Sequence, residues 1–434
     1  MALSTRFEQF RDYAPDACHW SYDSRLSYDR TRTGDAMPAP KRKGSVFMII
    51  MRTSECRPGM KLGRSIYTEQ GHVLAGRGFI LTEHAIYKLQ QMGLPFLHIE
   101  EQGTEDIAPD QAIRDETLIV LHGALSHVLD ELSAGAKSAM AGSVVRFCMD
   151  AAKLLVDDLR VRRNHLCLPV YLSTTLTDGD KQHFLEHALN VGVCVTKLGL
   201  EEGLAGEELQ ALAMGAMLHD IGRLLLPGGL AERAMNGDIA EYANHAELGF
   251  RILRDSGFPS LTSQCALFHH ERVDGSGYPF GLQGSRIHPL IQWVSIFDMF
   301  DTLVNGRGGG APMLPHEALE VLYGGAGTLY DMGKVCRLRD SMALFPRGTT
   351  VRLSSGEIGV VAGFHEDSKQ RPIVRVIRNP EGTALDRPYE VDLKRQLHLM
   401  ISGFGTSGSE NAVPAQEVKA APIHRGGSRV FHVV

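Results

Sequence analysis

Residues 269–279 bring two adjacent imidazoles, two acids and a glycine-rich turn into one short stretch, HHERVDGSGYP. Gly275 and Gly277 allow the backbone to take a positive φ or to approach a ligand closely, and Pro279 fixes the exit of the turn. Packing a hydrophobic core does not require this combination. A metal site beside a loop that holds an anionic or planar molecule does require it. We therefore expect other segments of the chain to supply the remaining metal ligands.

Further imidazoles and carboxylates lie near helix ends or inside apolar runs, where an unpaired charge is expensive to bury. His219 and Asp220 are adjacent at the end of an apolar helix, and their side chains point about 100° apart, so the pair can serve two metals or one metal from two sides. Nitrogen and oxygen ligands of this kind suit Fe, Mn, Zn or Co. The candidate ligands are His187, His219, Asp220, His245, His269, His270 and Asp298.

Each candidate has a plainer interpretation when it is taken singly. A helix-borne histidine near a core is usually a hydrogen-bonded structural residue. Asp220 could be a helix-end acid, and Asp298 could be half of a salt bridge. Only the set as a whole favours a metal centre.

The order of these residues resembles that of a known family. His187, His219-Asp220 and Asp298 are similar to the metal-binding pattern of the HD phosphohydrolase superfamily. The added histidines and the segment 269–279 are similar to the HD-GYP subfamily. The resemblance extends over about residues 165–325.

The family implies a helical bundle that holds two, sometimes three, metal ions, often iron or manganese. It implies hydrolysis of cyclic di-GMP to linear pGpG and on to GMP. Residue by residue, it makes all seven candidates metal ligands, with Asp220 bridging. It places Gly277, Tyr278 and Pro279 in the signature loop near the substrate.

The chain departs from the family pattern at three places. Arg223 stands where Lys is usual; it keeps the positive charge but cannot give up a proton, which favours charge stabilisation over proton transfer. His183 stands where some members carry the Glu that supports a third metal, which favours two ions. Residues 305–310 lack the usual basic residues, although Arg307 can stand in for the first of them.

The predicted chemistry is an in-line attack on a phosphodiester by a hydroxide that bridges two metals. Arg223 and Arg307 are expected to stabilise charge on the phosphoryl oxygens. Glu271 and Asp274 are expected to support the histidines from behind, with help in proton transfer as the alternative. Tyr278 either stacks on a base or packs as a turn residue.

Two other functions stay open at this point. One is a metal phosphohydrolase of another nucleotide, which the altered 305–310 stretch permits. The other is a weakly catalytic signalling module that contacts partners such as diguanylate cyclases. A homodimer is among the alternatives for the oligomeric state.

Composition limits the class of protein. The 434 residues are 43% hydrophobic and 22% charged, which is typical of a soluble protein of two or three domains. The net charge of -6 is not the positive charge that is typical of proteins that bind a nucleic acid polymer. Seven cysteines without a C-x-x-C pair indicate reduced thiols, and the apolar run 46–51 is too short for a signal peptide or a membrane span. We therefore expect a cytoplasmic protein without a membrane segment.

The patterns predict a multidomain chain: a central all-α HD-type bundle flanked by a small N-terminal α+β module and a small C-terminal antiparallel β module. Helical spacing is clearest at 181–198, 207–219, 239–255, 261–271, 286–304 and 315–323. The predicted segments are a disordered leader at 1–45, the α+β module at 46–105, a helical linker at 106–164, the bundle at 165–330, the β module at 340–402 and a disordered tail at 403–434.

Overall fold

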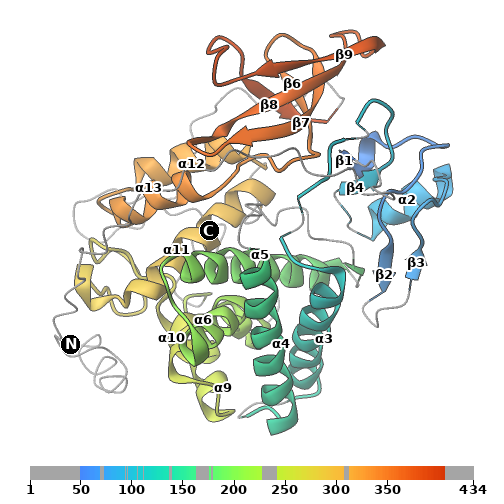
Figure 1. Cartoon of the computed structure of the whole chain (residues 1–434). Coiled ribbons are helices and arrows are strands. Elements are labelled where there is room, and N and C mark those ends of the chain that lie inside the picture. Colours follow the sequence, from blue (N-terminus) through green and yellow to red (C-terminus); the bar gives the residue numbers. More distant parts are fainter. Residues whose placement is uncertain are drawn as a thin grey trace.

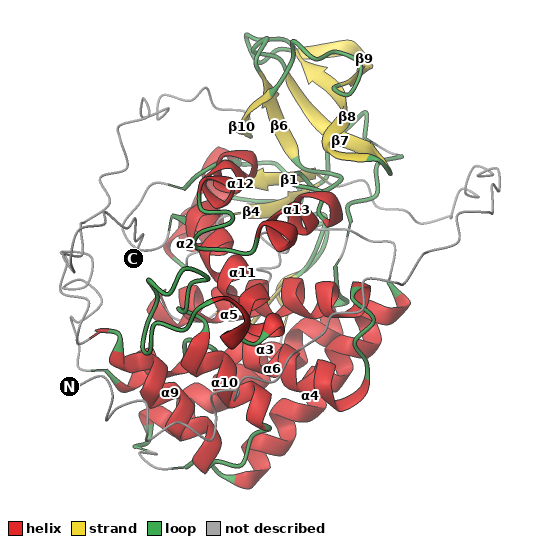
Figure 2. Ribbon diagram, turned by 90° about the vertical axis from the view of Figure 1, so that its left-hand side faces the viewer, coloured by secondary structure: helices red, strands yellow, loops and turns green. Residues whose placement is uncertain are grey.

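A computed structural model describes residues 49–68, 73–92, 94, 96–104, 106–110, 112–135, 139–162, 175–176, 179–226, 242–306 and 312–405. A helical bundle forms the body, and a small α+β module and a five-stranded sheet lie at one end of it (Figure 1). Figure 2 shows the same arrangement from the side. The predicted leader and the predicted tail, except for 403–405, lie outside the described residues.

The bundle consists of helices at the predicted places. Their bounds are α3 (Asp115–Ser133), α4 (Gly142–Val161), α5 (Gly179–Glu201), α6 (Gly206–Leu218), α9 (Asn244–Asp255), α10 (Ser260–Phe268), α11 (Pro289–Asn305) and α12 (Pro315–Gly324). Short 3-10 turns follow α6 and precede α11, namely η3 (Ile221–Leu225) and η4 (Gly284–Arg286). The all-α prediction for this part of the chain is confirmed.

Helix α13 (Met332–Ser341) is absent from the sequence prediction. Asp331 caps it by accepting a hydrogen bond from the backbone N–H of Lys334 at 2.9 Å. Its apolar stripe is short, with Val335 and Leu338 buried, and this explains why periodicity alone did not identify it.

Helices α3 and α4, which form most of the predicted helical linker at 106–164, pack against the other helices of the bundle. Leu121 and Leu155 are fully buried in one apolar cluster with Leu185, Leu209 and Leu253 of the other helices. Two amphipathic helices cannot leave such faces in water, so they pack against α5 and α6.

The N-terminal module consists of short strands around one helix. These elements are β1 (Ile49–Arg52), η1 (Thr53–Glu55), β2 (Ile66–Thr68), β3 (Val73–Ala75), α2 (Glu83–Gln91) and β4 (Phe96–Ile99). β1 and β4 are antiparallel, with Ile49 opposite Ile99, and β2 lies between β3 and the two-residue strand β5 (Thr175–Leu176). The Thr82 hydroxyl caps α2 by accepting from the backbone N–H of Ala85 at 3.1 Å.

The C-terminal module is antiparallel, as the sequence predicts, and its strands follow the order β10-β6-β7-β8-β9. Strand β10 is absent from the prediction, which put residues 403–434 in a disordered tail. Its strands are β6 (Thr350–Leu353), β7 (Ile358–His365), β8 (Ser368–Arg378), β9 (Ala384–Asp392) and β10 (Ile401–Phe404). The sheet touches the N-terminal module where the backbone N–H of Ile50 donates to the carbonyl of Gly348 at 2.8 Å. Arg375 pairs with Asp106, and Arg378 with Glu101 at 2.8 Å.

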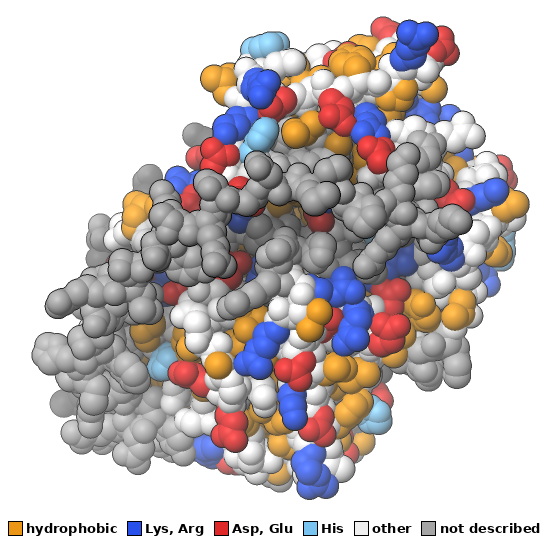
Figure 3. All heavy atoms as spheres, viewed as in Figure 1, with side chains coloured by type: hydrophobic (Ala, Val, Ile, Leu, Met, Phe, Trp, Pro, Cys, Tyr) orange, Lys and Arg blue, Asp and Glu red, His pale blue; other side chains and the backbone are white. Residues whose placement is uncertain are grey.

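In the part of the chain that the structure describes, no helix is long and apolar enough to span a bilayer. Lys and Arg side chains are interspersed with Asp and Glu over the face of α3 and α4 (Figure 3).

Gly222 lets the turn after α6 lie directly against α9. A Cβ at this position would be 1.9 Å from the carbonyl oxygen of His245 and 2.6 Å from the backbone nitrogen of Gly249. Both are backbone atoms, so neither can turn away. We predict that Gly222→Ala lowers the free energy of unfolding by at least about 1–3 kcal/mol in chemical denaturation. Gly324→Ala, with no atom within 4 Å of the new Cβ, is the control and is expected to stay within about 0.5 kcal/mol of the wild type.

His122 is buried in α3 at 2% exposure, and neither ring nitrogen has a hydrogen-bond partner. Burial lowers the pKa of this imidazole to about 4. The unfolded chain therefore takes up a proton between about pH 6.5 and pH 4 that the folded chain does not, and the free energy of unfolding falls as the pH falls through this window.

We predict that His122→Leu makes this loss shallower, by up to about 1.4 kcal/mol per pH unit inside the window. Denaturant melts of chelator-treated protein from pH 7.5 to pH 4.5 measure the slope. His84→Leu, which changes an exposed histidine, is expected to keep the wild-type slope. Equal slopes for His122→Leu and the wild type would contradict the burial of a neutral imidazole.

Candidate metal centre

The seven candidate ligands come together in two adjoining groups at the centre of the bundle. His187, His219 and Asp298 form one group, and Asp220, His245, His269 and His270 form the other. Within each group the ligand atoms lie within 4.8 Å of one another. His219, His245 and His269 are fully buried. Five elements supply these residues: α5, the end of α6, the start of α9, the end of α10 and the middle of α11.

Asp220 lies between the two groups and faces both. Its Oδ2 is 3.8 Å from Nε2 of His187 and 3.7 Å from Nε2 of His219. Its Oδ1 is 3.4 Å from Nε2 of His245 and 3.5 Å from Nε2 of His269. One carboxylate oxygen thus serves each group, which is the placement that a bridging ligand requires.

The spacing within the groups suits ions with ligands at about 2.0–2.2 Å, because two such ligands on one ion lie roughly 3–3.5 Å apart. Nε2 of His187 is 3.2 Å from Nε2 of His219 and 3.3 Å from Oδ1 of Asp298. In the other group, Nε2 of His245 is 3.1 Å from Nε2 of His270.

The Nδ1 atoms, on the other side of each ring, show why the contacts between Nε2 atoms are not simple hydrogen bonds. Nδ1 of His219 is 2.8 Å from the carbonyl of Ala216, and Nδ1 of His245 is 2.7 Å from the carbonyl of Tyr242. Nδ1 of His269 is 3.0 Å from the carbonyl of Ala266. Carbonyl oxygens only accept, so Nδ1 carries the proton and Nε2 presents a lone pair.

Buried lone pairs and carboxylate oxygens therefore face one another at the centre. This arrangement is repulsive without a cation, and the donor set fits divalent ions bound by nitrogen and oxygen. Burial lowers the pKa of His245 to about 4 and that of His270 well below its ordinary value, so both are neutral at pH 7. Burial alone would raise the pKa of Asp220, but the Arg223 guanidinium holds it well below its usual range.

Asp301 holds His187, a role that the sequence analysis missed. Its Oδ2 accepts from Nδ1 of His187 at 2.7 Å, and its Oδ1 accepts from the side-chain amides of Asn190 at 2.7 Å and Asn305 at 2.8 Å. A signal was present: 298, 301 and 305 lie on one face of α11 at spacings of three and four. Such supporting contacts orient a ligand ring and fix its tautomer.

Arg223 pairs with the bridging carboxylate. Its Nη1 donates to Oδ2 of Asp220 at 2.8 Å, and its guanidinium lies 5.6 Å from the centre of the Tyr242 ring. The Arg223 side chain as a whole is 39% exposed, so the ligands of the centre do not enclose it. This placement is compatible with the charge-stabilising role expected for it.

Glu271 and Asp274 form hydrogen bonds to the signature loop, and their expected role behind the histidines stays a prediction. The Glu271 carboxylate accepts from the backbone N–H groups of Phe280 and Leu282, each at 2.8 Å. Burial raises its pKa to about 7 against these two hydrogen bonds. Asp274 accepts from the backbone N–H of Ser276 at 2.9 Å and so shapes the turn.

The Gly-Tyr-Pro loop packs closely against the segment that carries His269 and His270. A Cβ at Gly277 would be 2.4 Å from the carbonyl oxygen of His270, so this position requires a glycine for a close backbone approach. The Tyr278 ring lies 4.6 Å from the His270 ring at an interplanar angle of 31°. Of the two roles expected for Tyr278, packing in the turn is the one that its contacts favour, and Pro279 follows it in the same loop.

Two residues of the sequence analysis remain, Arg307 and His183. Arg307 lies outside the described residues. His183 lies one turn before His187 on α5 and is exposed, and it belongs to neither of the two groups.

Comparisons with known proteins agree with this geometry. Residues 173–333 match the family described as HD domain, and residues 350–406 match the KOW domain associated with HD domain. The first match covers the bundle from α5 to α12, and the second covers the predicted β module.

Three curated relatives are similar to part of the chain. The chain is 37% identical over 164 residues to the cyclic di-GMP phosphodiesterase response regulator RpfG of Xanthomonas campestris pv. campestris, covering 36% of this chain and 41% of that protein. It is 28% identical over 212 residues to a cyclic di-GMP phosphodiesterase of Pseudomonas aeruginosa, covering 48% and 51%. It is 30% identical over 154 residues to 3'3'-cGAMP-specific phosphodiesterase 1 of Vibrio cholerae, covering 35% and 36%. The chain thus spans 36% to 51% of the length of these relatives.

Removing Asp301 tests the support of the His187 group. We predict that Asp301→Ala weakens binding of Mn²⁺ at this group about 10–100-fold, because the His187 ring loses its acceptor and its fixed tautomer. The other group keeps its backbone acceptors, so metal analysis is expected to fall from two ions per chain towards one. Asp340→Ala, at an exposed acid paired with Arg339, is the control and is expected to keep wild-type loading. Equal affinity at both groups in Asp301→Ala would contradict the assignment.

Proposed function

We propose that this chain, whose residues 173–333 match the HD domain family and carry the HD-GYP signature, is a metal-dependent phosphodiesterase that hydrolyses cyclic di-GMP to pGpG and/or GMP. The observation that carries the proposal is the Asp220 carboxylate, which faces three-residue clusters of buried ligands on both sides. The names of the relatives support the choice of a cyclic dinucleotide as substrate.

We infer two ions, with iron or manganese as the metals that fit the nitrogen and oxygen donors. His187, His219 and Asp298 would hold one, His245, His269 and His270 would hold the other, and Asp220 would serve both. When bound, such ions supply an activated water and polarise the phosphodiester. The exposed side chain of His183, where a third ion would need a carboxylate, supports a two-ion centre.

The residues of the chain have separate tasks in this proposal. Asp220 stays ionised beside Arg223 and keeps the two ligand groups in a fixed relation. The Arg223 guanidinium would bind a phosphoryl oxygen and stabilise charge that develops in the transition state. Glu271 holds the loop at 280–282, and Tyr278 covers the His270 ring from the side of the loop.

The wider organisation is proposed on the same basis. We divide the chain into the N-terminal module, the bundle, now including α3 and α4, and the KOW module. A cytoplasmic location, contacts with diguanylate cyclases and a homodimer stay predictions.

A turnover assay tests the proposed function. The full chain, loaded anaerobically with Mn²⁺ or Fe²⁺, is expected to release pGpG or GMP from cyclic di-GMP. We predict that Asp220→Ala lowers kcat by a factor of at least about 10³, because it removes a ligand of both groups at once. Asp255→Asn, which changes an exposed acid on α9, is expected to keep the wild-type rate.

The comparison of substrates separates the alternatives. Faster turnover of 3'3'-cGAMP than of cyclic di-GMP would show that the preferred substrate is another cyclic dinucleotide. Wild-type protein that binds two ions and hydrolyses no phosphodiester would contradict the proposal and favour a signalling module.

A further inference from the structure

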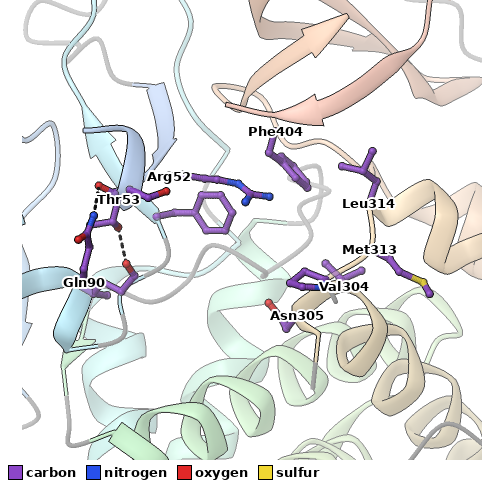
Figure 4. Close-up of a pocket in the computed structure, with 12 residues that line it drawn as sticks. Arg52, Thr53, Gln90, Val304, Asn305, Met313, Leu314 and Phe404 are labelled. Carbon is purple, nitrogen blue, oxygen red and sulfur yellow. Dashed lines mark hydrogen bonds between the residues drawn. The ribbon is translucent and has the colours of Figure 1, made fainter. Parts of the chain in front are cut away.

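A cavity of about 370 Å³ opens where the N-terminal module, the bundle and the KOW module meet (Figure 4). Its walls come from β1 and η1, from α2 and β4, from the last turn of α11, from residues 312–314 and from β10. None of the candidate metal ligands lines it. The volume is in the range of small-ligand sites.

The polar lining is positive and rich in hydrogen-bonding groups. Among the described residues that line the cavity, Arg52 is the one charged side chain. The backbone of this wall is held in place, because the Thr53 hydroxyl donates to the carbonyl of Leu94 at 2.5 Å and the Gln90 amide donates to the carbonyl of Thr53 at 3.3 Å. Arg52 is thus a cation on a fixed wall, with no acid among the described residues that line the cavity, and this favours an anionic ligand.

The apolar lining is aromatic. Arg52 reaches from β1 towards Phe404, and its guanidinium carbon lies 6.0 Å from the centre of that ring (Figure 4). Phe96 and Phe404 are 6.1 Å apart in an edge-to-face pair. A guanidinium in this position can bind a phosphate or carboxylate by its fork, while an aromatic ring of the ligand packs beside the phenylalanines.

The floor of the cavity is connected to the metal centre by hydrogen bonds. Asn305 lines the cavity, and its Nδ2 donates to Oδ1 of Asp301 at 2.8 Å. Oδ2 of the same carboxylate is 2.7 Å from Nδ1 of His187. A ligand acceptor that draws the Asn305 amide away would remove one of the donors that hold Asp301, and the His187 ring would lose part of its support.

We propose that this cavity binds a small aromatic anion, of about the size of a nucleoside monophosphate, and that its occupancy weakens metal binding at the His187 group. The inference depends on the cavity and on the hydrogen bonds through Asn305. It does not depend on hydrolysis of a cyclic dinucleotide, so its tests use binding readouts.

Hydrogen exchange of the full, chelator-treated chain locates the site, with GMP as the probe and guanosine and inorganic phosphate as comparators. GMP is expected to slow exchange in peptides that cover 49–56 and 300–306, and both comparators are expected to act at higher concentrations. Arg52→Gln is expected to raise the half-saturating GMP concentration at least about tenfold, and Arg52→Lys by less, because Lys keeps the charge without the fork. Arg57→Gln removes an equal charge from an exposed position on the same module and is expected to change nothing.

A Mn²⁺ titration followed by electron paramagnetic resonance measures the coupling. Saturating GMP is expected to weaken Mn²⁺ binding about threefold or more in the wild type and in Arg57→Gln, and to have no such effect in Arg52→Gln. The binding site is wrong if GMP protects neither peptide, if phosphate alone protects as well as GMP, or if the two Gln variants behave alike. Unchanged Mn²⁺ affinity in the presence of bound GMP would overturn the coupling.

Discussion

The repulsion among buried lone pairs at the centre of the bundle is the constraint on which the rest of the structure depends. Three imidazoles present Nε2 inward because backbone carbonyls accept from their Nδ1 atoms, and Asp301 does the same for His187. Asp220 adds a carboxylate to this set. Burying such groups costs several kcal/mol each unless cations neutralise them, so the fold around them must be stabilised elsewhere.

That stabilisation comes from helices whose apolar faces meet on all sides of the centre. Three of the histidines lie at helix ends, where the chain can turn an imidazole inward and still offer a free carbonyl to its other nitrogen. His219 and His269 each follow the last residue of a helix, and His245 is the second residue of one. The close approach of Gly222 to the backbone of His245 shows how tightly the turn after α6 must fit. A larger residue there would move a ligand together with the backbone.

Much of this could be predicted from the sequence, because the ligand types, their order and the apolar spacing around them are local signals. The seven candidate ligands, which the structure brings together, were chosen in this way. The supporting residues were harder to find, since Glu271 binds amides nine and eleven residues away and Asp301 binds partners on two helices. Such choices are set by tertiary packing and leave only a weak trace in spacing. The same limit explains why α3 and α4 were predicted to be a linker. Amphipathic spacing shows that one face of a helix is buried, but it does not show which element covers that face.

Helix α11 explains why the outer modules can matter to the centre. Its middle carries Asp298 and Asp301, and its last residue is Asn305, which bonds to Asp301 and also lines the cavity between the modules. Arg375 and Arg378 of the KOW module form ion pairs with Asp106 and Glu101, respectively. These pairs join the module to the segment before α3. A ligand bound in the cavity, as proposed, would contact the end of α11 and act through the Asp301 carboxylate on the orientation of His187.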